Sequence, residues 1–196
     1  MKKADKKRIV LEAASEAVRV KTALMEQSTQ AMINMAAGLA SALRRGGTIY
    51  LAGNGGSAAD CQHFATELVV RLSGKFERPS LPAVSLTSDS VLLTAAGNDY
   101  GFERIFVRPV ESLVRRRDRL FLISTSGNSE NLIWAARTAK RKKVPVYALL
   151  GGDGGKLKKY ANQAIVVPSA SVQRVQEEHI FIIHNLVRLV ERELFL

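Results

Sequence analysis

Short apolar runs rich in β-branched residues alternate with helical stretches from residue 48 onward, and this alternation restricts the fold more than any other feature. Five runs have the pattern of buried strands: 48–52, 83–87, 120–124, 145–150 and 164–168. Helices are expected over 58–72, 129–143 and 172–194, with a short helix after the second strand. Repetition of strand, glycine-rich turn and helix favours right-handed crossovers. We therefore predict an α/β fold with a doubly wound, five-stranded parallel sheet.

The first 46 residues are helical in pattern and stand outside this alternation. Apolar residues recur at helical spacing between Ile9 and Met25, and a second run from Gln30 to Arg45 ends at Gly46-Gly47, a helix-stop signal. We expect two N-terminal helices over 1–46 that cover the sheet or a neighbouring subunit. With an α/β core over 47–196 they would form a single domain spanning 1–196.

Composition narrows the class of protein and its surroundings. Lys and Arg number 29 against 18 Asp and Glu, a net charge of +11 that suits a phosphorylated or acidic ligand. Basic runs at 2–8, 115–119 and 140–143 come without aromatic stacking residues, so nucleic acid is not the expected partner. One cysteine, Cys61, cannot form an internal disulfide, as expected of a cytoplasmic protein. Neither a membrane span nor a signal peptide is expected from the apolar runs.

Two turns rich in small polar residues follow the first and third strands. They are Gly53-Asn54-Gly55-Gly56-Ser57 and Ser124-Thr125-Ser126-Gly127-Asn128-Ser129. Ligands of open α/β sheets bind beyond the carboxyl ends of the strands, where backbone amides, hydroxyls and a helix N-terminus can hold an anion. Neither turn has the lysine or the spacing of a nucleotide motif. Together they predict a site for a small phosphorylated ligand, although a single such turn is equally typical of ordinary βα connections.

All three histidines lie on two predicted helices. His63 and Glu67 are four residues apart, hence on one helix face, and could share a divalent cation such as Zn²⁺ or form a simple hydrogen bond. On the last helix Gln176 and His184 are separated by about 12 Å along the axis, so they can share a metal only by leaning together. The segment Gly97-Asn98-Asp99-Tyr100-Gly101 could bind sugar hydroxyls through Asn98 and Asp99, or be a simple turn.

Several motifs closely resemble the phosphoheptose isomerase branch of the sugar isomerase domain family, which has a flavodoxin-like fold. They cover nearly the whole chain after residue 48, in order and at similar spacing. The motifs are GNGGSAAD at 53–60, QHFATEL at 62–68, LPA at 81–83, LTA at 93–95, GNDYGFE at 97–103, ISTSGNSEN at 123–131 and QRVQEEH at 173–179.

This resemblance implies a cytoplasmic, homotetrameric isomerase that converts sedoheptulose 7-phosphate into D-glycero-D-manno-heptose 7-phosphate for lipopolysaccharide or other surface glycans. It implies Zn²⁺ ligands at His63, Glu67, Gln176 and His184, with Glu67 and His184 as the proton-transfer pair. It also implies substrate contacts at Asn54, Gly55, Gly56, Ser57, Glu67, Asn98, Asp99 and Gln176, and a phosphate cradle of Ser124, Thr125, Ser126 and Ser129.

The same family branch contains a regulatory binding protein that associates with the DnaA initiator and lacks isomerase activity. The segment Glu77-Arg78-Pro79-Ser80-Leu81-Pro82 resembles that relative as well, and a basic surface would suit a nucleoprotein partner. Glu67, His184 and the two polar turns discriminate between these hypotheses, because the binding relative lacks several of these groups. All are present here, which favours the enzyme.

Overall fold

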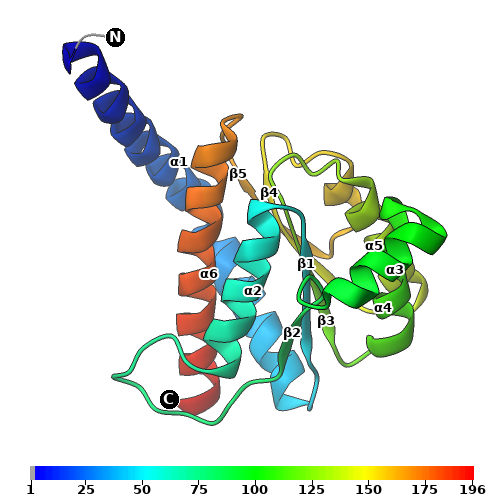
Figure 1. Cartoon of the computed structure of the whole chain (residues 1–196). Coiled ribbons are helices and arrows are strands. Elements are labelled where there is room, and N and C mark those ends of the chain that lie inside the picture. The colour runs from blue at the N-terminus through cyan, green and yellow to red at the C-terminus, as the bar shows by residue number, and fades with distance from the viewer. Residues whose placement is uncertain (1–2) are drawn as a thin grey trace.

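The protein, described by a computed structural model over residues 3–196, contains a five-stranded parallel sheet with helices on both faces (Figure 1). The strands are β1 (Ile49–Gly53), β2 (Ala83–Ser85), β3 (Arg119–Ser124), β4 (Val146–Gly151) and β5 (Gln163–Val167). Their order is β2-β1-β3-β4-β5, and every neighbouring pair is parallel. This flavodoxin-like order reverses between β1 and β3, where such sheets bind ligands at their carboxyl edge. The predicted α/β class and sheet are confirmed.

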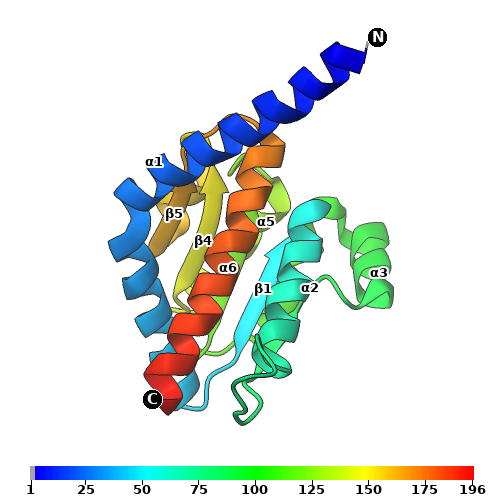
Figure 2. The same ribbon diagram turned by 90° about the vertical axis from the view of Figure 1, so that its left-hand side faces the viewer.

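Two helical layers bury the two faces of the sheet. The helices are α1 (Lys3–Arg44), α2 (Gly56–Val69), α3 (Ser90–Tyr100), α4 (Val107–Leu113), α5 (Glu130–Arg141) and α6 (Val172–Phe195), with 3-10 turns η1 (Phe102–Arg104) and η2 (Lys156–Tyr160). Figures 1 and 2 show α1, α2 and α6 on one face and α3, α4 and α5 on the other. Successive strand residues point to opposite faces of the sheet. Leu51 and Phe121 pack in the core under α1, α2 and α6, whereas Ala52 and Leu122 pack in the core under α3, α4 and α5.

The N-terminal segment is one helix of 42 residues, so the prediction of two helices is wrong. Residues 26–29 include neither glycine nor proline, and the Thr29 hydroxyl donates to the Met25 carbonyl at 2.6 Å inside the helix. The helix contains a glycine at position 38 because the Cβ of any other residue there would collide with the Tyr147 ring. The predicted stop at Gly46 is confirmed, since this residue has a φ of +72°.

From Ala13 onward α1 has contacts with α6, whereas its first turns extend past the rest of the molecule (Figures 1 and 2). Lys21 of α1 donates to the buried carboxylate of Glu178 on α6 at 2.8 Å, and Arg174 donates to the Ala13 carbonyl. These contacts set the direction in which α1 leaves the body. Within residues 3–196, none of the helices combines the length and the apolar character needed to cross a membrane.

Candidate functional site

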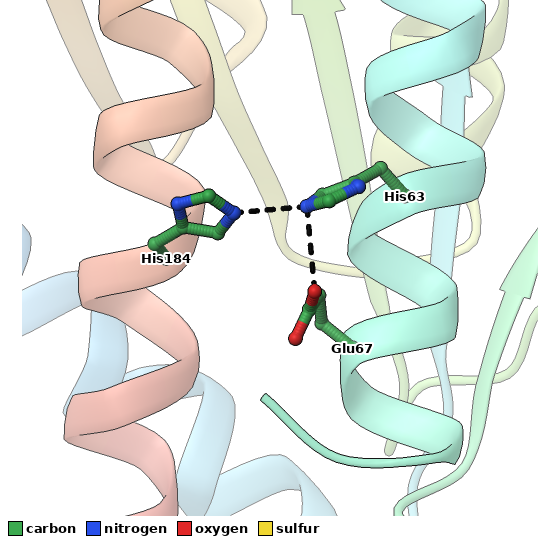
Figure 3. A group of neighbouring side chains, drawn as sticks. All are labelled: His63, Glu67 and His184. Atoms are coloured by element: carbon green, nitrogen blue, oxygen red, sulfur yellow. Dashed lines mark hydrogen bonds and ion pairs between the residues drawn. The ribbon is translucent and has the colours of Figure 1, made fainter. Parts of the chain in front are cut away.

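Three side chains of metal-binding types, from two helices, point toward one another between α2 and α6 (Figure 3). Their ligand atoms all lie within 4.8 Å of one another. His63 Nε2 is 2.9 Å from His184 Nε2 and 3.4 Å from Glu67 Oε1. The helical i,i+4 spacing brings His63 and Glu67 to one face of α2, as predicted, and the packing of α6 adds His184, 121 residues further along the chain.

This donor set fits a zinc ion. Two imidazole nitrogens and one carboxylate are a common catalytic zinc set, which leaves a position free for substrate or water. In a tetrahedral site with bonds of ~2.0–2.1 Å, ligand atoms lie roughly 3.3 Å apart, near two of the separations seen here. The second carboxylate oxygen of Glu67, Oε2, is buried and has no hydrogen-bond partner among the described residues. A cation beside Glu67 would compensate this buried charge.

Asp60 lies one helical turn before His63 on α2 and is only 8% exposed. Burial raises the pKa of this carboxyl from 3.8 to about 6, and the charge of nearby His63 opposes the shift. Its Oδ2 atom is buried without a hydrogen-bond partner in the described part of the chain. Asp60 and His63 are therefore close enough for their charges to interact.

The polar turn after β1 is tied to the start of α5. Asn54 and Asn131 exchange two amide hydrogen bonds, Nδ2 to Oδ1, at 2.9 and 2.8 Å. Sequence reasoning assigned no role to Asn131, although it lies inside the motif that carried the resemblance. Gly55 adopts a φ of +55°, which favours glycine, and precedes the first residue of α2. The backbone amides at this turn are thus presented at the carboxyl edge of the sheet.

The second polar turn closes on itself around its hydroxyls. Ser124 Oγ accepts from the Gly127 amide at 3.1 Å and lies 3.4 Å from Ser129 Oγ. Ser126 Oγ accepts from the Asn128 amide at 3.2 Å. Ser129 is the N-cap residue of α5, so the turn leads directly into a helix N-terminus. Hydroxyls and a helix N-terminus at one place suit a phosphate group.

The first turns of α6 connect these two polar turns. A Cβ at position 56 would collide with the Gln176 amide, so this side chain lies directly over Gly56. One residue earlier, Val175 packs on Gly151 beside the Thr125 carbonyl. The glycine at 56 thus makes room for Gln176. The structure brings Gln176 to the β1–α2 turn, and its role as a fourth metal ligand remains a prediction.

Asn98 and Asp99 lie away from the cluster formed by His63, Glu67 and His184. They belong to the last turn of α3, so the reading of 97–101 as a simple turn is wrong. Both side chains are exposed, and Asn98 Nδ2 donates to Asp99 Oδ1 at 2.8 Å. Helix α3 lies on the opposite face of the sheet from α2 and α6 (Figure 1).

A hollow of about 470 Å³ on the α3 and α5 side of the sheet was not foreseen from sequence. Its lining joins two predicted substrate residues, Asn54 and Ser129, to residues that were given no role: Phe102, Glu103, Glu130, Asn131 and Trp134. No spacing in the sequence signals this hollow, because its lining comes from the β1 turn, from η1 and from α5.

Comparison with known proteins agrees with this architecture. Residues 14–151 match the family model described as SIS domain. The chain therefore belongs to the class of SIS-domain proteins, whose sheet and helical layers it shows.

Within that class the similarity is specific. The chain is 48% identical over 177 residues to a phosphoheptose isomerase of Geobacter sp. (strain M21), covering 90% of this chain and 91% of the relative. A phosphoheptose isomerase structure from Francisella tularensis superposes with a TM-score of 0.90 at 34% identity, covering 98% and 100% of the two chains. The enzyme from Neisseria gonorrhoeae gives 0.87 at 38%, covering 95% and 98%. The chain belongs to the phosphoheptose isomerase family.

Proposed function

We propose that this protein converts sedoheptulose 7-phosphate into D-glycero-D-manno-heptose 7-phosphate, as a cytoplasmic step toward nucleotide-activated heptose. The observation that carries the proposal is the meeting of His63, Glu67 and His184 in a chain similar over nearly its whole length to phosphoheptose isomerases. The resemblance to the regulatory binding protein is the weaker hypothesis, because that relative lacks several of these groups.

The reaction moves one proton between neighbouring carbons. A base removes a proton from C1 of the ketose, an enediol forms as the carbonyl oxygen at C2 is protonated, and a proton returns to C2 while the C1 hydroxyl becomes the aldehyde. Glu67 and His184 are the two groups for this work. Glu67 Oε1 faces His63, and a carboxylate that binds the cation through one oxygen could take up the proton on the other.

His63, Glu67, Gln176 and His184 would hold Zn²⁺, which supplies polarisation of the carbonyl and hydroxyl oxygens and stabilises negative charge. Asp60 would support His63 from the buried side of α2. The remaining substrate groups would be held by Asn54, Gly55, Gly56, Ser57, Asn98, Asp99 and Gln176.

The phosphate would bind at the turn of Ser124, Thr125, Ser126 and Ser129. Since phosphate takes no part in the proton transfer, neutral hydroxyls and backbone amides are sufficient to position it. The first turn of α6 supports this arrangement, because Val175 adjoins the Thr125 carbonyl while Gln176 lies over Gly56. Substrate bound at this edge could therefore reach from the phosphate turn toward α2 and α6.

We also propose a homotetramer. The N-terminal part of α1 exposes the large apolar side chains Ile9, Val10, Leu11 and Val18, and its first turns extend beyond the body (Figure 2). Side chains of this kind at such density are typical of a surface that another subunit covers. A tetramer also offers a way to bring α3, with Asn98 and Asp99, close to the His63, Glu67 and His184 cluster of a neighbouring subunit. Sedimentation or light scattering should give four chains per particle.

The decisive experiment incubates purified protein with sedoheptulose 7-phosphate and follows the aldose phosphate, before and after chelation and after Zn²⁺ is returned. We expect turnover that chelation abolishes and Zn²⁺ restores. Turnover that is unaffected by exhaustive chelation would contradict the proposed role of Zn²⁺. Absence of turnover in the zinc-loaded protein would contradict the proposed substrate.

A further inference from the structure

Arg78 lies in the irregular segment between α2 and β2, yet its side chain is only 1% exposed. Its guanidinium donates to the carbonyl oxygens of Glu67 at 2.7 Å, Leu68 at 2.6 Å and Pro79 at 3.1 Å. Its Nε atom donates to Glu191 Oε1 on α6 at 3.0 Å. One buried side chain therefore connects three parts of the molecule: the end of α2, the segment that follows it, and α6.

Two of the three carbonyl groups that Arg78 binds lie at the C-terminus of α2. The last carbonyls of a helix have no intrahelical donor, and a cation at that end also interacts favourably with the helix dipole. One of the two helical carbonyls belongs to Glu67, the residue whose carboxylate faces His63. The backbone that carries the proposed base is thus fixed by Arg78 directly.

Glu191 extends the same connection to the other half of the site. It follows His184 by seven residues, two helical turns, so it lies on the same side of α6 about 10.5 Å further along the axis. The Glu191 side chain is 7% exposed. Because the ion pair is buried, removing one partner would leave an uncompensated charge, which strongly favours keeping both in contact.

We propose that Arg78 is a positioning residue, which together with Glu191 sets the separation of α2 and α6 and so holds Glu67 within reach of His63 and His184. The inference rests on the proposed function for its catalytic consequence. A planar guanidinium is needed, because its donors point to α2 and to α6 at once, and a lysine ammonium at that place cannot reach all four acceptors.

Arg78→Lys tests the proposal because it keeps the charge and loses the fork. We expect kcat to fall on the order of 10- to 100-fold, since displacement of catalytic groups by ~1 Å has costs of this size. KM should stay within about twofold, because the phosphate turn is not touched. Zn²⁺ affinity, measured by competition with a chromophoric chelator, should fall roughly tenfold or more.

Glu178→Gln is the matched control. Glu178 is also a buried carboxylate of α6 in an ion pair, but its partner is Lys21 of α1, at 2.8 Å. We expect this variant to lose thermal stability while keeping wild-type kcat and Zn²⁺ affinity, compared at a temperature at which both variants are folded. Equal kcat and equal Zn²⁺ affinity in Arg78→Lys and Glu178→Gln would reduce Arg78 to a purely structural role and overturn the proposal.

Should Arg78→Lys fail to fold, Glu191→Gln provides the second test. It keeps the caps on α2 and removes only the charge on α6, so kcat and Zn²⁺ affinity should fall in the same direction by about threefold to tenfold. Wild-type values for both would overturn the proposal. If Zn²⁺ affinity falls in these variants while the wild-type protein does not isomerise sedoheptulose 7-phosphate, the positioning role stands and the proposed substrate is wrong.

Discussion

The inner and outer faces of α2 and α6 both carry side chains that could do chemistry, but the two faces give these side chains opposite properties. On the outer side of the pair, His63, Glu67 and His184 converge and keep access to solvent. On the inner side, Cys61 and His179 are fully buried against the sheet. His179 precedes His184 by only five residues. Burial and neighbours, and not the type of residue, decide which groups can do chemistry.

Electrostatics express this difference. Burial lowers the pKa of His179 from 6.5 to about 4, and its Nε2 atom donates to the Leu150 carbonyl at 3.3 Å. Burial likewise raises the pKa of the Cys61 thiol well above its ordinary value. Both inner groups are therefore neutral in the folded protein near pH 7, and we expect them to be unreactive.

The largest effect is expected at Glu67. Glu67→Gln preserves size and hydrogen bonding but removes basicity, so kcat should fall on the order of 10²-fold or more with an unchanged unfolding midpoint. Steady-state kinetics beside thermal denaturation measures both quantities. Near-wild-type turnover would remove Glu67 from proton transfer and weaken the distinction between the two faces.

His179 should control acid stability and leave catalysis alone. Its folded pKa of about 4 lies below the unfolded value, so the stability it contributes is complete above pH 6.5 and is lost as pH falls toward 4. At about 1.4 kcal/mol per pKa unit this loss amounts to roughly 3 kcal/mol. In His179→Gln the fall in unfolding free energy between pH 6.5 and 4 should flatten, while kcat near pH 7.5 stays close to wild type. An unchanged acid slope would mean that other groups drive acid unfolding.

Variants of the polar turn after β3 should change KM more than kcat, unlike variants on either face of α2 and α6. Ser126→Ala and Ser124→Ala each remove a hydroxyl from the proposed phosphate site, so KM should rise about tenfold with a smaller change in kcat. Ser112→Ala, at the end of α4, is a control hydroxyl away from the turn. If both turn variants keep a wild-type KM, phosphate binds elsewhere.

The smallest effect is expected at Cys61. Cys61→Ala should cost on the order of 1 kcal/mol of stability and leave turnover unchanged. Native protein should resist alkylation by iodoacetamide, because the buried thiol does not ionise. Rapid alkylation of Cys61 in the native protein, with loss of activity, would show that this thiol is reactive and would contradict the division between the two faces.

Local patterns in the sequence specified much of the fold. The alternation of apolar runs and helices predicted all five strands, because a parallel sheet buried on both faces demands apolar runs of that length. The i,i+4 spacing of His63 and Glu67 predicted their contact, since a helix fixes it within one turn. The break expected within α1 did not occur, because weak periodicity alone does not end a helix, and residues 26–29 contain neither glycine nor proline.

Tertiary structure alone decided which distant residues meet. His184 faces His63, Asn131 pairs with Asn54, and Arg78 bridges α2 to Glu191, across separations of 121, 77 and 113 residues. The hydrophobic periodicity of α6 predicts that one of its faces is buried. It does not predict which helices contact its other faces. That choice follows from the strand order, which places the first and last helices of the core side by side on the same face of the sheet. The residue types of the site could therefore be predicted from the sequence, whereas tertiary packing decided which of these residues come together.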